Sequence, residues 1–278
     1  MYSYLRHLKG DSCQDLDREC RCGDATSVDA SIRVAEIGCG AGWSSIYLSS
    51  GFCNIHVDGI DVDSKSIELA HLNAFNHSKQ LQQRKRLDHI SSSSGTEQQR
   101  SKLQFAVGDL DELPRVLSEG SYDLVTMFEC LHHMDGPVYA LQQAKKLLKP
   151  KYLSYPGGIV LIAEERMEDR LEDMLPAQSI KSSNPQLDSG SSSNGSESHN
   201  CNCSINNNNN AVAKWVYIFS LFNCLPQTVK SMKRENSSAP AGAAMNPSLI
   251  KQSALQAGFS SVYIVHENEC WRFYQCNL

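Results

Sequence analysis

Short apolar runs alternate with helical patterns between residues 32 and 163. The runs are rich in aliphatic side chains and are bounded by polar or glycine-containing turns, so they predict strands. The predicted strands cover residues 32–37, 54–60, 103–107, 122–128 and 158–163. Apolar strands joined by helices are typical of βαβ units, so we predict a buried parallel sheet in an α/β domain.

Helical spacing fills the segments between these strands. A glycine loop at residues 38–42 leads into the first helix. Asp63 or Ser64 can cap the second helix. The inward face of that helix carries side chains at i, i+3, i+4 and i+7: Ile67, Ala70, His71 and Ala74. A third helix is predicted from Pro137 to a point before Pro150.

The C-terminal part adds a helix and two strands. Asn246-Pro247 predicts the start of this helix, and Gly258 predicts its end. The strands at residues 262–266 and 270–276 are separated by so short a connection that we expect an antiparallel hairpin. The predicted body is therefore a mainly parallel sheet that ends in one antiparallel strand.

Low-complexity sequence interrupts this body. We expect residues 1–30 to form a poorly ordered tail and residues 31–278 to form one domain. Residues 77–102 and 181–210 are strongly polar and are predicted to be disordered surface inserts. A more apolar and aromatic segment at about 214–245 is predicted to act as a lid over a substrate.

The charge balance narrows the choice of partners. A formal net charge of -5 and a pI near 6.0 disfavour a surface built for nucleic acid, so none is expected as a partner. The basic cluster at Arg84-Lys85-Arg86 leaves three interpretations open: a nuclear signal, a patch for an acidic partner, and a solvated insert. We favour the insert.

The cysteines and the lengths of the apolar runs indicate in which cellular compartment the protein is expected. The 11 cysteines are odd in number and scattered, which disfavours a disulfide framework. Cys20 and Cys22, like Cys201 and Cys203, lack the spacing of common zinc pairs, so we predict no metal site. No stretch approaches the roughly 20 apolar residues that cross a bilayer, so we expect a cytoplasmic protein without a membrane partner.

The strongest chemical signal is Gly38-Cys39-Gly40-Ala41-Gly42, which follows Glu36 at a strand end. Ligands bind at this edge of a parallel sheet. A dinucleotide fingerprint would need glycine where Trp43 stands, and the lysine of a P-loop is absent. Three alternate glycines still let the backbone approach a ligand closely, and Glu36 favours a cationic one.

Two further acids end the next two predicted strands. Asp61 lies where a carboxylate can accept hydrogen bonds from a ribose diol, and Asp109 lies where the far end of an adenosine would reach. Each acid taken alone could be a helix or turn cap. Acids at three successive strand ends, with a glycine loop on the first, favour one shared ligand site.

The glycine loop is one of several motifs that resemble those of the class I S-adenosylmethionine-dependent methyltransferases. The other matching stretches are Gly59-Ile60-Asp61, Gly108-Asp109, Tyr122-Asp123-Leu124-Val125 and Leu147-Leu148-Lys149-Pro150. The resemblance implies a Rossmann-like, doubly wound, seven-stranded sheet and S-adenosyl-L-methionine as cofactor. It assigns the methionine end to Glu36 and the glycine loop, the ribose to Asp61, and the adenine to Asp109. The cofactor contacts implied are Glu36, Gly38, Cys39, Gly40, Gly42, Asp61, Val62, Asp109, Leu110 and Phe128.

The C-terminal half is similar to bacterial-type methyltransferases that often carry an N-terminal winged-helix domain. Tyr217-Ile218-Phe219-Ser220 and Trp271-Arg272-Phe273-Tyr274 are among the matching stretches. This chain has Asn223 and Asn246 where that group tends to have histidine and arginine. Since only residues 1–30 precede the first strand, we expect the winged-helix domain to be absent or the chain to be truncated.

The acceptor side is expected where the fourth strand ends. Glu129 and His132 are the candidate catalytic residues there, and two roles stay open for His132: a general base, or a side chain that only supports the loop. We predict methyl transfer to a small or medium organic acceptor with an oxygen or nitrogen nucleophile. The alternatives are a catalytically silent S-adenosylmethionine-binding regulatory module and a protein methyltransferase. The sequence predicts no oligomeric state.

Overall fold

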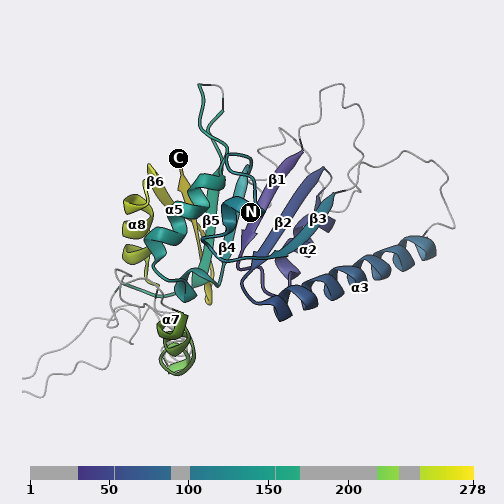
Figure 1. The fold of residues 1–278 in the computed structure, drawn as a ribbon, viewed down its shortest axis with the longest axis horizontal. Coiled ribbons are helices and arrows are strands. Elements are labelled where there is room, and N and C mark those ends of the chain that lie inside the picture. Colours follow the sequence, from purple (N-terminus) through teal and green to yellow (C-terminus); the bar gives the residue numbers. More distant parts are fainter. Residues whose placement is uncertain (1–30, 53, 89–100, 154, 170–217, 232–244) are drawn as a thin grey trace, which may run out of the picture.

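The computed structural model describes residues 31–52, 54–88, 101–153, 155–169, 218–231 and 245–278 (Figure 1). The predicted N-terminal tail and the predicted insert at 181–210 lie outside the described residues. Only residues 218–231 and Met245 of the predicted lid lie inside them.

One sheet of seven strands runs through the domain in the order β3-β2-β1-β4-β5-β7-β6 (Figure 1). Its strands are β1 (Ile32–Ile37), β2 (Ile55–Asp61), β3 (Lys102–Val107), β4 (Leu124–Phe128), β5 (Ile159–Glu165), β6 (Ser261–Glu267) and β7 (Trp271–Asn277). All neighbouring pairs from β3 to β5 are parallel. β7 runs antiparallel to both β5 and β6, so the antiparallel strand is inserted between them. The predicted α/β sheet is confirmed.

Helices cover both faces of this sheet. They are α2 (Trp43–Gly51), α3 (Ser64–Asp88), α4 (Leu113–Val116), α5 (Pro137–Leu147), α7 (Leu225–Ser231) and α8 (Pro247–Gln256), with a 3-10 turn η1 (Leu131–His133) and a π-helical turn η3 (Ser220–Cys224). Two neighbouring residues of β1 show that helices pack on each face of the sheet. Val34 packs in a core cluster with Leu48 of α2, whereas Ala35 packs in another cluster with Leu141 of α5. Alternation along a strand therefore buries both faces.

The first predicted insert begins later than expected. α3 continues from Ser64 to Asp88, so residues 77–88 are helical rather than disordered, and residues 89–100 lie outside the described part. The C-terminal half of α3 runs past the edge strand β3 (Figure 1). Its glutamine, leucine and lysine residues are good helix formers, which explains how a polar segment stays helical. The polar composition alone was misleading because it fits an exposed helix as well as a loop.

Helix α8 is bounded as the sequence predicts. The Oδ1 atom of Asn246 accepts a hydrogen bond from the backbone N–H of Leu249 at 2.8 Å, which makes it the N-cap. Gly258, with a φ angle of 92°, ends the helix. No described helix combines the length and the apolar character that crossing a membrane requires.

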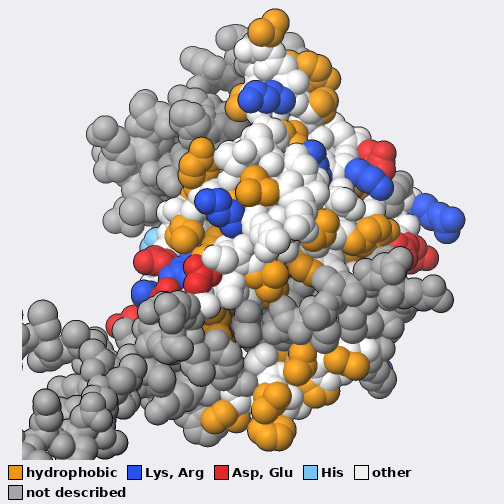
Figure 2. All heavy atoms as spheres, turned by 90° about the vertical axis from the view of Figure 1, so that its left-hand side faces the viewer, with side chains coloured by type: hydrophobic (Ala, Val, Ile, Leu, Met, Phe, Trp, Pro, Cys, Tyr) orange, Lys and Arg blue, Asp and Glu red, His pale blue; other side chains and the backbone are white. Residues whose placement is uncertain are grey.

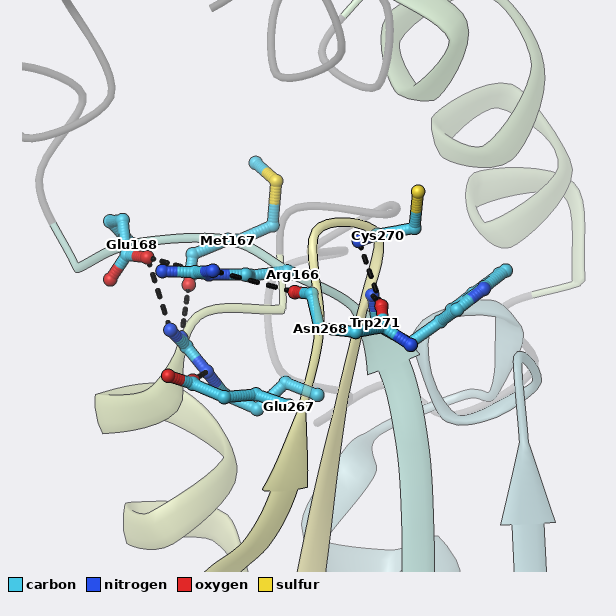
Figure 3. Close-up of polar contacts among 8 residues, drawn as sticks. Arg166, Met167, Glu168, Glu267, Asn268, Cys270 and Trp271 are labelled. Carbon is cyan, nitrogen blue, oxygen red and sulfur yellow. Dashed lines mark hydrogen bonds and ion pairs between the residues drawn. The ribbon is translucent and has the colours of Figure 1, made fainter. Parts of the chain in front are cut away.

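A buried arginine joins the segment after β5 to the C-terminal hairpin, and Figure 3 labels its partners Met167, Glu168 and Glu267. The side chain of Arg272 is 5% exposed and forms ion pairs with Glu168 at 3.0 Å and Glu267 at 2.8 Å. It also donates to the backbone oxygen of Met167 at 2.6 Å. Arg272 and Met167 lie 105 positions apart in the sequence, so this contact holds two distant parts of the chain together.

Candidate functional site

The glycine loop follows β1 at the carboxyl edge of the sheet. Gly38 and Gly40 have φ angles of 72° and 51°, a region that side chains with a Cβ seldom adopt. A Cβ on Gly38 would lie 2.6 Å from the Cβ of Cys130. A Cβ on Gly40 would meet nothing within 4 Å. The backbone of Gly40 therefore borders open space, as a surface that receives a ligand must.

Glu36 lies behind this loop. Its carboxylate is 1% exposed and accepts hydrogen bonds from the hydroxyls of Ser44 and Ser45, at the start of α2. Burial raises the pKa of Glu36 above its usual range, although the two serines act in the opposite direction. The structure shows that Glu36 joins the first turn of α2 to the end of β1. A direct contact of Glu36 with a ligand stays a prediction.

A cavity of about 630 Å³ opens beside the loop, within the size range of small-molecule sites. One wall, the glycine-loop side, consists of Gly38, Gly40, Asp61, Val62, Asp109 and Leu110. A second part of the lining, the β4 side, consists of Glu129, Cys130, His133, Met134 and Asp135. The described residues that line the cavity include the carboxylates of Asp61, Asp109, Asp111, Glu129 and Asp135, and none of these lining residues is a lysine or an arginine.

On the glycine-loop side, backbone N–H groups hold the acids. Asp61 accepts from the N–H of Gly40 at 2.8 Å and from the N–H of Asp63 at 2.9 Å. Asp109 accepts from the N–H of Leu110 at 2.6 Å. A carboxylate has about four lone-pair positions, so the two bonds to Asp61 leave capacity for a ligand. The cap role and the ligand role considered for these acids are therefore compatible.

On the β4 side, Glu129 adopts a φ angle of 53°, unusual for a residue other than glycine. Its side chain lines the cavity, and its Oε1 atom is buried without a hydrogen-bond partner among the described residues. Burial, together with the charges of Glu164 and Glu165, raises the pKa of Glu129 to about 10. Strained backbone and crowded carboxylates are features that cluster at functional sites.

His132 is buried behind this wall. His132 is 3% exposed and is not among the described residues that line the cavity. Its Nδ1 atom lies 2.5 Å from Oε2 of Glu164. Burial would lower the pKa of His132, but the hydrogen bond and charge of Glu164 outweigh burial and raise it. The neighbouring His133 does line the cavity, and burial with the charge of His132 lowers its pKa to about 4.

The structure brings most, but not all, of the predicted residues to one place. The predicted residues on the cavity are Gly38, Gly40, Asp61, Val62, Asp109, Leu110 and Glu129. The predicted residues outside its described lining are Glu36, Cys39, Gly42, Phe128 and His132. Phe128 instead packs edge-to-face on Phe273, and a Cβ on Gly42 would lie 2.6 Å from the ring of Phe105.

Sequence reasoning assigned no role to His133 and missed Glu164. His133 adjoins a residue that was singled out, and the choice between adjacent histidines depends on a 3-10 turn that the sequence did not reveal. Glu164 lies at the end of β5, beside Glu165. An acid at the carboxyl end of a fifth strand was a usable signal, by the same argument that identified Asp61 and Asp109.

The described part of the predicted lid contacts the β4 side. The hydroxyl of Thr228, on α7, donates to the backbone oxygen of His132 at 2.9 Å. The outer surface of η3 and α7 is apolar, with Ile218, Phe219, Leu221, Phe222 and Val229 each 48–77% exposed. Figure 2 shows hydrophobic side chains gathered at the lower end of the molecule, where Figure 1 places α7.

Comparison with protein families and with curated proteins finds similarity to methyltransferases. A family model described as "Methyltransferase domain" matches residues 35–153. The chain is 27% identical over 135 residues to a mitochondrial ubiquinone biosynthesis O-methyltransferase of Candida albicans. That match covers 49% of this chain and 34% of the relative, so the chain matches about a third of the length of this curated protein.

Comparison with solved structures supports the same fold. A carbon methyltransferase named CurJ superimposes with a TM-score of 0.51 at 15% identity, covering 91% of this chain and 50% of the other. An O-methyltransferase family protein from Burkholderia thailandensis gives a TM-score of 0.50 at 14% identity, covering 89% and 51%. At such low identity these likenesses establish the fold, and this chain spans about half the length of each.

Proposed function

We propose that the chain is a class I S-adenosylmethionine-dependent methyltransferase and that it transfers a methyl group from S-adenosyl-L-methionine to a small or medium organic acceptor. The match of residues 35–153 to a methyltransferase-domain model supports this proposal. The acceptor atom in this proposal is an oxygen or nitrogen nucleophile. The likeness to a ubiquinone biosynthesis O-methyltransferase favours oxygen.

The observation that carries the proposal is the character of the cavity. It joins bare glycine backbone to the carboxylates of Asp61, Asp109, Asp111 and Asp135, without lysine or arginine among its described lining residues. A phosphate-bearing ligand would be repelled by such a wall, whereas a sulfonium and an ammonium group would be attracted. The donor supplies a methyl group on a positively charged sulfur.

The glycine-loop side fits this donor. The open space next to Gly40 accommodates the donor's amino-acid end close to the backbone. Asp61 has lone pairs left to accept from the two ribose hydroxyls, and Asp109 lies along the same wall with Leu110 as an apolar neighbour for the adenine. Glu36 contributes indirectly by holding α2 against the loop.

The β4 side lines the same cavity as the glycine-loop side, so it is the proposed acceptor site. Holding a nucleophile in line with the methyl group supplies much of the rate in such reactions. Glu129 is the proposed group that orients the acceptor, because its carboxylate lines the cavity. His132 is assigned a positioning role, since it is buried and bound to Glu164.

A labelling experiment tests this proposal. The purified protein is incubated with S-adenosylmethionine carrying a deuterated methyl group and with a small-molecule extract, and the products are examined by mass spectrometry. The proposal predicts at least one metabolite that gains a labelled methyl group together with equal formation of S-adenosylhomocysteine, and loss of both with Asp61→Ala. Donor binding without any labelled product would favour a silent regulatory module, and label on protein alone would favour a protein substrate.

A further inference from the structure

Two imidazoles and a thiol lie close together where the segment 218–231 contacts η1. His132 and His133 come from η1, and Cys224 comes from the π-helical turn η3. One ligand atom from each residue lies within 4.8 Å of the other two. Cys224 is 2% exposed and His132 is 3% exposed, so these groups are largely removed from water. Segments 92 residues apart therefore place three metal-binding side chains together, since His132 and Cys224 differ by 92 in number.

The surroundings hold these side chains in place. The hydroxyl oxygen of Thr228 lies 2.9 Å from both the backbone oxygen of His132 and that of Cys224, so one side chain joins the two segments. The ring centroids of His132 and His133 are 4.0 Å apart. Glu164 contacts Nδ1 of His132, and a carboxylate on one ring nitrogen is the usual support of an imidazole whose other nitrogen binds a metal.

The donor set selects the type of metal. Two imidazole nitrogens and one thiolate suit Zn²⁺, whereas Mg²⁺ and Ca²⁺ prefer oxygen ligands. Around a tetrahedral Zn²⁺ with bonds of about 2.1 Å to nitrogen and about 2.3 Å to sulfur, the ligand atoms are roughly 3.5 Å apart. The ligand atoms lie at most 4.8 Å apart, so they would need to close by at most about 1.3 Å, a shift within the reach of side-chain rotation.

We propose that His132, His133 and Cys224 bind one Zn²⁺ ion, which fastens the helical segment 218–231 to the end of β4. This goes beyond methyl transfer and departs from the sequence-based expectation that the chain has no metal site. Three protein ligands leave a fourth position for water or another ligand. A second group of nearby ligand atoms, from Glu129, His132, Glu164 and Glu165, shares His132 but is mainly carboxylate.

Cobalt substitution tests the proposed site on the full-length chain. Tetrahedral Co²⁺ absorbs in the visible region, and a thiolate ligand adds a charge-transfer band in the near ultraviolet. All proteins carry Cys201→Ser and Cys203→Ser, so that this pair contributes no sulfur ligand. We expect one equivalent of Co²⁺ to produce both bands, Zn²⁺ to abolish them, and millimolar Mg²⁺ to leave them unchanged.

Three variants locate the ligands. Cys224→Ser is expected to remove the charge-transfer band and to weaken Zn²⁺ binding at least tenfold in competition with a chromophoric chelator. His133→Ala is expected to weaken Zn²⁺ binding similarly and covers the case in which Cys224→Ser does not fold, as judged by circular dichroism. Cys270→Ser, at an exposed cysteine, is the matched control and is expected to behave as the parent. A parent without a thiolate band, or a folded Cys224→Ser protein that retains the band, would overturn the proposal.

Discussion

The two walls of the cavity are held by different kinds of contact. On the glycine-loop side, backbone N–H groups hold the carboxylates of Asp61 and Asp109 at 2.6–2.9 Å. On the β4 side, the main contact joins two buried side chains, His132 and Glu164, which lie 32 residues apart. The first wall is therefore held by backbone donors, and the second by a buried pair of side chains. Substitutions should consequently affect ligand binding at the first wall and stability at the second.

Glu164→Ala should give the largest effect. It leaves His132 and the backbone N–H of Leu131 without their buried acceptor, so we expect the free energy of unfolding to fall by about 3–5 kcal/mol. Urea denaturation measures this change. Glu164→Gln keeps one acceptor oxygen and is expected to lose less. A fall below about 1 kcal/mol with Glu164→Ala would mean that the β4 side does not depend on this pair.

Arg272→Met extends the test to a second long-range contact. The substitution keeps the apolar stem but removes charge-assisted bonds to Glu168, Glu267 and the backbone of Met167, so a loss of about 2–3 kcal/mol in unfolding free energy is expected. Arg166→Met is the control, because Arg166 has a 32% exposed side chain paired with Glu168 and should contribute about 0.5 kcal/mol. Equal losses in both variants would contradict the role assigned to burial.

Asp61→Ala probes the glycine-loop side. We expect it to weaken the binding of S-adenosylmethionine by about 1–3 kcal/mol, because charge-assisted hydrogen bonds to the ribose and to the N–H of Gly40 are lost. Calorimetric titration measures the dissociation constant. Asp63→Ala removes an exposed acid two residues away that caps α3 and is not among the lining residues, so donor binding should persist there. An unchanged dissociation constant in Asp61→Ala would refute the ribose assignment.

Asn246→Ala should give the smallest effect and belongs to neither wall. It removes the N-cap of α8, at a cost of about 1 kcal/mol in unfolding free energy by thermal or urea denaturation. Donor affinity is expected to stay the same, since Asn246 is not among the lining residues. A clear loss of donor affinity would show that α8 is coupled to the cavity.

The same contrast explains what the sequence could predict. The strands, the glycine loop and the acids at Asp61 and Asp109 follow from apolar periodicity and from the rule that ligands bind at the carboxyl edge of a parallel sheet. The contacts of Glu36, Phe128 and His132 could not be read in this way. Glu36 binds two serines at the start of α2, and Phe128 and His132 contact side chains far along the chain. The length of α3 was missed because a polar composition does not separate an exposed helix from a loop.

The most direct test is a calorimetric titration of the full-length protein with S-adenosylmethionine, and separately with NAD. A cavity rimmed by carboxylates and glycine backbone should bind one equivalent of S-adenosylmethionine and give no heat with NAD. Binding of NAD without binding of S-adenosylmethionine would contradict the central claim.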